Sequence, residues 1–247
     1  MIKQWIERFR RRDRRALSRL ITFVSRGEHL QPIRDALTHQ SGSGPVVAFT
    51  GSGGVGKSTL IGKMIDLARS QGRSIGVLAC DPESSLTGGA LLGDRVRMTG
   101  PLDDGVFIRS LAVPSGRQAI AENLQLMIDL MKDFGFQIVV LETVGSGQGD
   151  TAAGQVADVV VLLVQPKAGD DLQWEKAGVL EIADIVVVHK ADLPGADRAQ
   201  EQLRQVLNLP GCRQVHVVRA SAVKNEGLEP LWKLIHGCAP SATQARS

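Results

Sequence analysis

A glycine-rich stretch near residue 50 constrains this chain more than any other feature. It is Gly51-Ser52-Gly53-Gly54-Val55-Gly56-Lys57-Ser58-Thr59. The apolar run Pro45–Thr50 precedes it and indicates a buried strand, and the helical pattern Leu60–Ala68 follows it. A strand, a glycine loop and a helix in this order are the context that the phosphate-binding loop G-x-x-x-x-G-K-[ST] requires. The stretch therefore predicts a nucleoside triphosphate site, against the simpler interpretation of an ordinary glycine turn.

The chemistry expected of this loop follows from its residue types. Glycines lack Cβ atoms, so the backbone can fold back and aim its N–H groups inward. The N-terminus of the following helix adds further N–H groups and a partial positive charge. Lys57 supplies a cation for the β- and γ-phosphates, and Ser58 supplies a hydroxyl for Mg²⁺. We predict that residues 51–59 bind the nucleotide and that Lys57 is also catalytic.

Composition excludes several protein classes. The 247 residues suffice for one large core or a core with an appendage, and a hydrophobic fraction of 43% is ordinary for a globular protein. No apolar run approaches the roughly 18 residues of a membrane span. Three cysteines without C-x-x-C spacing argue against a disulfide framework and a zinc site, and suit a reducing cytoplasm. Residues 1–20 hold eight Lys or Arg and two acidic residues, so the basic excess is local and predicts no nucleic-acid partner.

The first 40 residues are predicted to form a helical extension. Apolar residues recur at helical spacing from Ile2 to Val24, and a run of arginines interrupts them. The extension either exposes a solvated basic face or docks an acidic partner or a membrane surface with it. Ser41–Gly44 indicates a flexible linker. We therefore expect an N-terminal helical extension over 1–40, a nucleotide-binding domain over 45–237 and a short tail over 238–247.

From residue 45 the pattern alternates between apolar strands and helices. Strands this apolar are buried on both faces, so the predicted fold class is α/β, with a mainly parallel sheet flanked by helices. In such sheets ligands bind beyond the carboxyl ends of the strands. The further strands expected are Ser74–Cys80, Val106–Leu111, Gln137–Glu142, Asp158–Gln165, Asp184–His189 and Gln214–Arg219. The further helices expected are Gln118–Phe134, Asp171–Glu181, Ala196–Leu207 and Leu228–Ile235.

Carboxylates near strand ends are candidate metal ligands beside Ser58. Asp81 follows the strand that ends at Cys80, where it can hold Mg²⁺ directly or through its water shell. Asp94 lies farther along the same connection, where a turn or helix-cap role fits equally well. Glu142 ends an apolar strand, where it can bind a metal ion or orient the attacking water.

The segment after Glu142 carries candidates for the hydrolytic step. Gly145 would let a peptide N–H face the γ-phosphate and be released after hydrolysis. Gln148 could orient the attacking water, although a glutamine in a loop is more often simply solvated. The transition state needs a cation. Arg95, Arg97 and Arg109 are the candidates within the chain, and a partner protein is the alternative source.

Two further segments predict recognition of guanine. The Asp192 carboxylate can accept hydrogen bonds from guanine N1–H and the 2-amino group, which adenine cannot offer. The stem of Lys190 can lie along the base. Ser221 and Ala222 end the next strand, where their backbone N–H groups can meet the base oxygen.

With these segments in order, the sequence resembles the MeaB/ArgK family of P-loop GTPases, also labelled LAO/AO transport ATPases. The resemblance covers roughly residues 14–235. It is carried by Arg14-Arg15-Ala16-Leu17, the phosphate loop, Asp81-Pro82, Thr87-Gly88-Gly89 through Gly93-Asp94-Arg95, Phe107-Ile108-Arg109, Glu142-Thr143-Val144-Gly145, Gly169-Asp170, Lys190-Ala191-Asp192 and Ser221-Ala222.

The resemblance implies a P-loop fold of the SIMIBI type and GTP hydrolysis. It also implies that Mg²⁺ is held near Ser58, Asp81, Asp94 and Glu142. The partner that it implies is an adenosylcobalamin-dependent acyl-CoA mutase, usually methylmalonyl-CoA mutase, which the GTPase chaperones.

The chain departs from the family pattern at three places. His189 replaces the Asn expected before Lys-x-Asp, so we expect guanine to be preferred but bound more weakly than with Asn. Gly149-Asp150 replaces the usual Ser-Glu. The chain also ends 26 residues after Ser221, where the family continues into a helical dimerisation arm, and this predicts a monomer or a weak homodimer.

Other functions compete with a mutase-linked GTPase. The alternative is a P-loop ATPase or a kinase linked to a transport system, as the second family label suggests. A partitioning-type ATPase would have Lys where this chain has Ser52, and a metal-insertion GTPase would favour clusters of His or Cys. A non-enzymatic adaptor would lose Lys57 or the metal ligands, which are intact.

Overall fold

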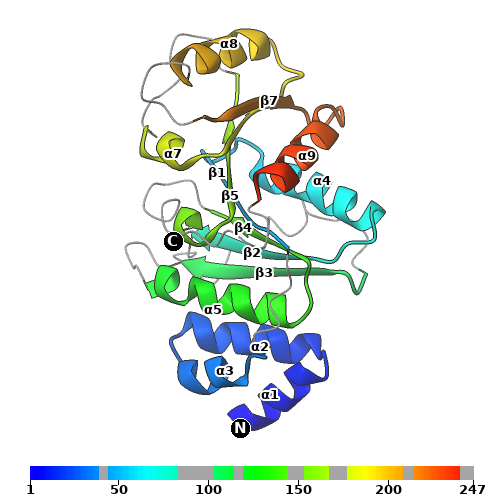
Figure 1. The fold of residues 1–247 in the computed structure, drawn as a ribbon, viewed down its shortest axis with the longest axis vertical. Helices are drawn as coiled ribbons and strands as arrows, with labels where there is room; N and C mark the ends of the chain where they lie inside the picture. Colours follow the sequence, from blue (N-terminus) through cyan, green and yellow to red (C-terminus); the bar gives the residue numbers. More distant parts are fainter. Residues whose placement is uncertain are drawn as a thin grey trace.

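The computed structural model of this chain describes residues 1–38, 44–82, 103–113, 119–143, 153–166, 177–207 and 214–239. Its centre is a seven-stranded sheet with the order β3-β2-β4-β1-β5-β6-β7 (Figure 1). Every described pairing in the sheet is parallel, which confirms the predicted fold class. The strands are β1 Val46–Gly51, β2 Ile75–Pro82, β3 Val106–Val113, β4 Ile138–Glu142, β5 Val159–Val164, β6 Ile185–His189 and β7 His216–Ala220.

The central strands are buried on both faces because helices cover the sheet from both sides. All residues of β1 are buried, and alternate side chains enter different cores: Val46 and Ala48 face one cluster, whereas Val47 and Phe49 face the other. The helices are α1 Ile2–Arg10, α2 Arg14–Ser25, α3 Leu30–Ala36, α4 Lys57–Ser70, α5 Ala119–Asp133, α7 Ala177–Ile182, α8 Ala196–Leu207 and α9 Leu228–Cys238.

One face of the sheet packs against α4 and α9, which also contact each other. The other face packs against α5, and α2 packs on α5 in turn (Figure 1). A smaller cluster joins α8 to β5 and β6. The layering follows from the sequence, because apolar residues recur at helical spacing along one side of each helix.

The N-terminal helices are part of the fold's main core. Phe9 of α1 and Leu20 of α2 are buried in the same cluster as α5 and the sheet. Asp13 caps α2, since its Oδ1 accepts hydrogen bonds from the backbone N–H groups of Arg15 and Ala16. Arg12 donates to the Asp133 carbonyl at the end of α5. The predicted amphipathic helices are therefore present, with one basic side chain used to bind α5.

Some boundaries differ from the sequence-based expectations. Strand β2 continues through Asp81 and Pro82, because both pair with residues of β3. The short helix α3 lies within the helical extension expected over 1–40, but beyond the apolar spacing that ends at Val24, and it contains Pro32 in its first turn. Within the described residues, no helix is long and apolar enough to cross a membrane.

Candidate functional site

The phosphate-loop sequence folds as a loop between β1 and α4. Gly51 ends β1 with a φ of 143°, and a Cβ atom there would lie 2.5 Å from the Leu163 carbonyl oxygen. Gly56 precedes α4 with a φ of 100°, in the left-handed region that favours glycine. The Val55 N–H donates to the Ser52 carbonyl at 3.3 Å, which closes the turn between them. The loop therefore leads directly into the N-terminus of α4, the kind of helix end that binds anions.

Lys57 is folded over this loop. Its Nζ donates hydrogen bonds to the carbonyl oxygens of Gly51 at 2.8 Å and Ser52 at 3.2 Å. The residue is only 9% exposed. A buried ammonium held by backbone carbonyls is well placed to exchange them for phosphate oxygens.

The next residue, Ser58, meets the end of β4. The Ser58 hydroxyl donates to Glu142 Oε1 at 2.7 Å, and Glu142 is 5% exposed. Glu142 reaches this point because β4 pairs with β1 and opposes Phe49 in register. A hydroxyl and a carboxylate in contact are hard oxygen donors, which suit Mg²⁺.

The other predicted ligands and switch residues are less well defined. Asp81 lies at the carboxyl end of β2, beside β4, but its side chain is outside the described part. Asp94, Gly145 and Gln148 lie outside the described residues. Within the described residues, no group of three His, Cys, Asp or Glu side chains is arranged to hold a metal ion. The pair of Ser58 and Glu142 thus needs oxygen donors from elsewhere to complete a magnesium site.

The two segments predicted to bind the base lie side by side. The Ser221 hydroxyl donates to Asp192 Oδ1, although 29 residues separate them in sequence. The Ala191 N–H also donates to the Ala220 carbonyl at 3.1 Å, because β6 and β7 are neighbours. The hydrogen bond from Ser221 lowers the pKa of Asp192, so this exposed carboxyl is ionised at neutral pH. Ala222 follows and is buried.

Lys190 connects the base segment to the phosphate loop. Its backbone is left-handed, with a φ of 56°. Its Nζ donates to the Gly54 carbonyl at 2.8 Å and to Gln165 Oε1 at 2.9 Å. Sequence reasoning missed Gln165, although a polar residue directly after the apolar strand β5 is a usable signal for this edge of the sheet.

Arg109 is placed away from this edge. It lies on β3, the strand at the far end of the sheet, and its guanidinium donates to the Thr22 hydroxyl of α2 at 2.8 Å. It therefore joins the sheet to the helical layer instead of facing the phosphate loop. Arg95 and Arg97 lie outside the described residues.

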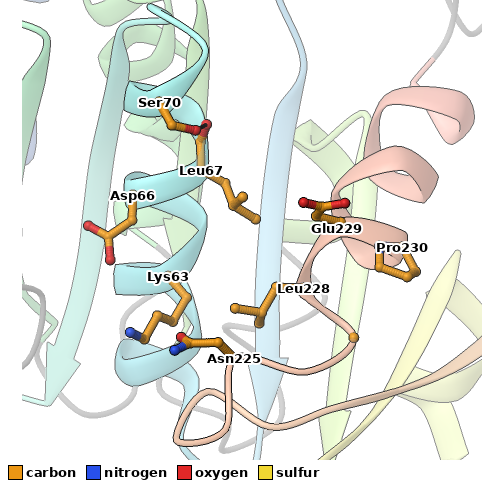
Figure 2. Close-up of a pocket in the computed structure, with 9 residues that line it drawn as sticks. Lys63, Asp66, Leu67, Ser70, Asn225, Leu228, Glu229 and Pro230 are labelled. Carbon is orange, nitrogen blue, oxygen red and sulfur yellow. Dashed lines mark hydrogen bonds between the residues drawn. The ribbon is translucent and has the colours of Figure 1, made fainter.

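A separate pocket of about 550 Å³ lies between α4 and the start of α9 (Figure 2). Leu67 and Leu228 contribute its apolar part, and Lys63, Asp66 and Glu229 contribute charged groups. None of residues 51–59 lines it. The pocket is thus distinct from the loop that carries the phosphate-binding residues.

Comparison with known proteins points in the same direction as the geometry. A family model described as methylmalonyl Co-A mutase-associated GTPase MeaB matches residues 17–246. A protein from Pyrococcus abyssi, whose name carries a provisional GTPase assignment, is 42% identical over 243 residues. That match covers 95% of this chain and 75% of the relative.

Two further similarities bear on function. A fused isobutyryl-CoA mutase from Cupriavidus metallidurans is 38% identical over 192 residues, which are 76% of this chain and 18% of that protein. The crystal structure of a LAO/AO transport system kinase superposes with a TM-score of 0.73 at 26% identity. That superposition covers 96% of this chain and 74% of the other.

Proposed function

This chain belongs to the family of methylmalonyl Co-A mutase-associated GTPases, MeaB, and we propose that it is a Mg²⁺-dependent regulatory GTPase that chaperones an adenosylcobalamin-dependent acyl-CoA mutase. The chain is a GTPase, as its family is. The observation that carries the nucleotide assignment is the contact between the phosphate loop and the base segment. Through Lys190 these two segments form one continuous site.

We assign the phosphates to the loop and to Lys57. The backbone N–H groups of residues 52–59 and the end of α4 attract the phosphate oxygens. The Lys57 ammonium adds a charge that its carbonyl contacts hold over the loop. Asp192 receives the two donors of guanine, and Ser221 fixes the orientation of that carboxylate. Gly145 and Gln148 remain proposed contributors to the hydrolytic step.

Ser58 and Glu142 fit a magnesium ion, because both present oxygen atoms at one point beside the loop. Asp81 and Asp94 are the further proposed ligands. When bound there, Mg²⁺ supplies positive charge to the phosphate oxygens as negative charge develops on them. Glu142, held by Ser58 within the buried end of β4, keeps its carboxylate at this position.

A fused relative supports the mutase as partner. The isobutyryl-CoA mutase from Cupriavidus metallidurans contains a stretch similar to most of this chain within a much longer protein. A second fused isobutyryl-CoA mutase, from Geobacillus kaustophilus, is 36% identical over 163 residues. Fusion holds the GTPase-like stretch and the mutase of those relatives at a high effective concentration, which favours contact between them. We therefore expect this separate GTPase to bind a separate mutase.

The name of the LAO/AO transport system kinase supports an alternative, in which the γ-phosphoryl group passes to a protein instead of water. Hydrolysis of GTP by the purified chain separates these possibilities. We expect Mg²⁺-dependent release of inorganic phosphate from GTP and much less from ATP. Lys57→Ala is the matched control, and we expect it to abolish tight nucleotide binding. Phosphate release by Lys57→Ala at the wild-type rate would refute the phosphate-loop assignment.

The partner is tested by capture from native lysate with a non-hydrolysable GTP analogue. We expect a cobalamin-dependent acyl-CoA mutase to be enriched with the wild-type chain and not with Lys57→Ala. The same mutase, purified, should then bind the wild-type chain directly in calorimetry. Direct binding that is absent at micromolar concentration, with or without nucleotide, would refute the chaperone role.

A further inference from the structure

His189, the last residue of β6, is buried against the phosphate loop. Only 3% of its surface is exposed, and its Nδ1 lies 2.8 Å from the Val55 carbonyl oxygen. A carbonyl oxygen can only accept a hydrogen bond, so Nδ1 carries a proton and donates it. Burial lowers the pKa of His189, and the ring is therefore neutral, with an unprotonated Nε2.

The same ring fills the space beside Gly56. A Cβ atom on Gly56 would lie 2.6 Å from His189 Cε1 and 2.7 Å from Nδ1. The imidazole therefore supports the loop where its backbone turns into α4. Lys190 acts alongside it by binding the Gly54 carbonyl. Lys190 and His189 thus bind the Gly54 and Val55 carbonyls, and the His189 ring leaves no room for a side chain on Gly56.

The second ring nitrogen shows that this histidine does not face a base. Nε2 is enclosed by protein atoms and has no hydrogen-bond partner among the described residues. A buried acceptor that protein atoms cover presents nothing to a ligand. The exposed Asp192, held by Ser221, is the group available to a base.

We infer that His189 is a positioning residue for the phosphate loop, which strengthens binding of every nucleotide by the same factor whatever its base. The inference rests on the proposed function, because it concerns how that nucleotide site is held. It assigns the two tasks to different residues: His189 fixes the loop that binds phosphate, and Asp192 selects the base.

Two amide substitutions test which ring nitrogen acts. The amide nitrogen of Asn is as many bonds from Cα as Nδ1, whereas the amide nitrogen of Gln corresponds to Nε2. We expect His189→Ala and His189→Gln to weaken GDP binding about 3- to 10-fold, the value of one hydrogen bond. His189→Asn should restore the affinity to within about twofold. Equal recovery by Gln and Asn would overturn the inference.

Calorimetry with GDP, ADP and inorganic tripolyphosphate separates positioning from base recognition. All three His189 variants should keep the wild-type ratio of GDP to ADP affinity. In each variant the affinity for tripolyphosphate should change by the same factor as the affinity for GDP. Asp192→Asn should change the ratio of GDP to ADP affinity and leave the affinity for tripolyphosphate unaffected.

A changed ratio of GDP to ADP affinity in the His189 variants, or an unchanged affinity of His189→Ala for tripolyphosphate, would refute the inference. Failure of wild type to prefer GDP would refute guanine recognition instead, and tripolyphosphate would still test His189. Circular dichroism and thermal unfolding establish that each variant is folded.

Discussion

At the scale of single residues, the negative charge beside Ser58 can be removed with almost no change in the shape of the Glu142 side chain. Glu142→Gln keeps an oxygen that can accept from Ser58, but it removes the negative charge. We expect kcat for GTP to fall by about tenfold or more, or about 1.4 kcal/mol, with a higher Mg²⁺ concentration needed for half-maximal rate. Phosphate release over a Mg²⁺ titration measures both. An unchanged Mg²⁺ dependence would give Glu142 a structural role alone.

His189 should make the stability of the nucleotide-free protein depend on pH. Burial lowers its pKa below the ordinary value of 6.5, so as pH falls below about 6.5 the unfolded chain takes up a proton that the folded chain refuses. The contribution of His189 to the free energy of unfolding should therefore decrease on acidification until the folded-state pKa is passed, and be constant well above pH 6.5. Urea unfolding of wild type and His189→Asn between pH 5 and 8 gives this difference. Parallel curves for the two proteins would show that His189 does not titrate in this way.

At the scale of elements, the phosphate loop and β6 depend on each other through Gly56. Gly54→Ala and Gly56→Ala both place a side chain at positive φ, but only the second meets another group, because nothing lies within 4 Å of a Cβ at Gly54. We expect Gly56→Ala to be the less stable by about 1–3 kcal/mol, the usual effect of overpacking. Urea unfolding without nucleotide measures the difference. Equal stabilities would mean that the His189 ring moves aside easily.

The elements themselves were largely predictable, since strands and helices depend on local pattern. Helix α8 has the expected bounds, Ala196–Leu207, and the apolar strands were found to within two residues at each end. The contacts between distant elements were not predictable. Arg12 was assigned to a basic stretch whose partners the sequence could not identify, and it binds the Asp133 carbonyl 121 residues away. For His189 the sequence predicts only an effect on the affinity for guanine. Sequence order does not show that β6 ends beside the phosphate loop, where His189 contacts the Val55 carbonyl.

At the scale of the whole molecule, the fold class followed from strand hydrophobicity, but the order of the strands did not. Neighbouring parallel strands are joined through long connections, so they need not follow each other in sequence. Strand β1 lies between β4 and β5, although both of these strands are far from β1 in the sequence. This order brings Gly51, Glu142 and His189 to one edge. The division of the chain at residues 40 to 45 and the monomeric or weakly dimeric state stay predictions.

The sheet order also bears on turnover. Arg109 lies on β3, three strands away from β1, and binds Thr22 of α2, so this candidate cation faces the helical layer. GTPases without an arginine finger in the chain hydrolyse slowly until a partner provides the missing charge. With Arg109 away from the phosphate loop, and with Arg95 and Arg97 outside the described residues, we expect the slow basal rate of GTPases without such an arginine, on the order of 10⁻⁴ to 10⁻³ s⁻¹.

Addition of the captured mutase should raise this rate at least about tenfold, because binding either supplies a cation or orders the residues at the γ-phosphate. Single-turnover phosphate release with and without the mutase measures the change, and Arg109→Ala serves as the control. That variant should lower the free energy of unfolding through the lost contact with Thr22 while the stimulated rate per folded molecule is retained. A basal rate of about 10⁻² s⁻¹ or more, or loss of stimulation in Arg109→Ala, would place the transition-state cation within this chain.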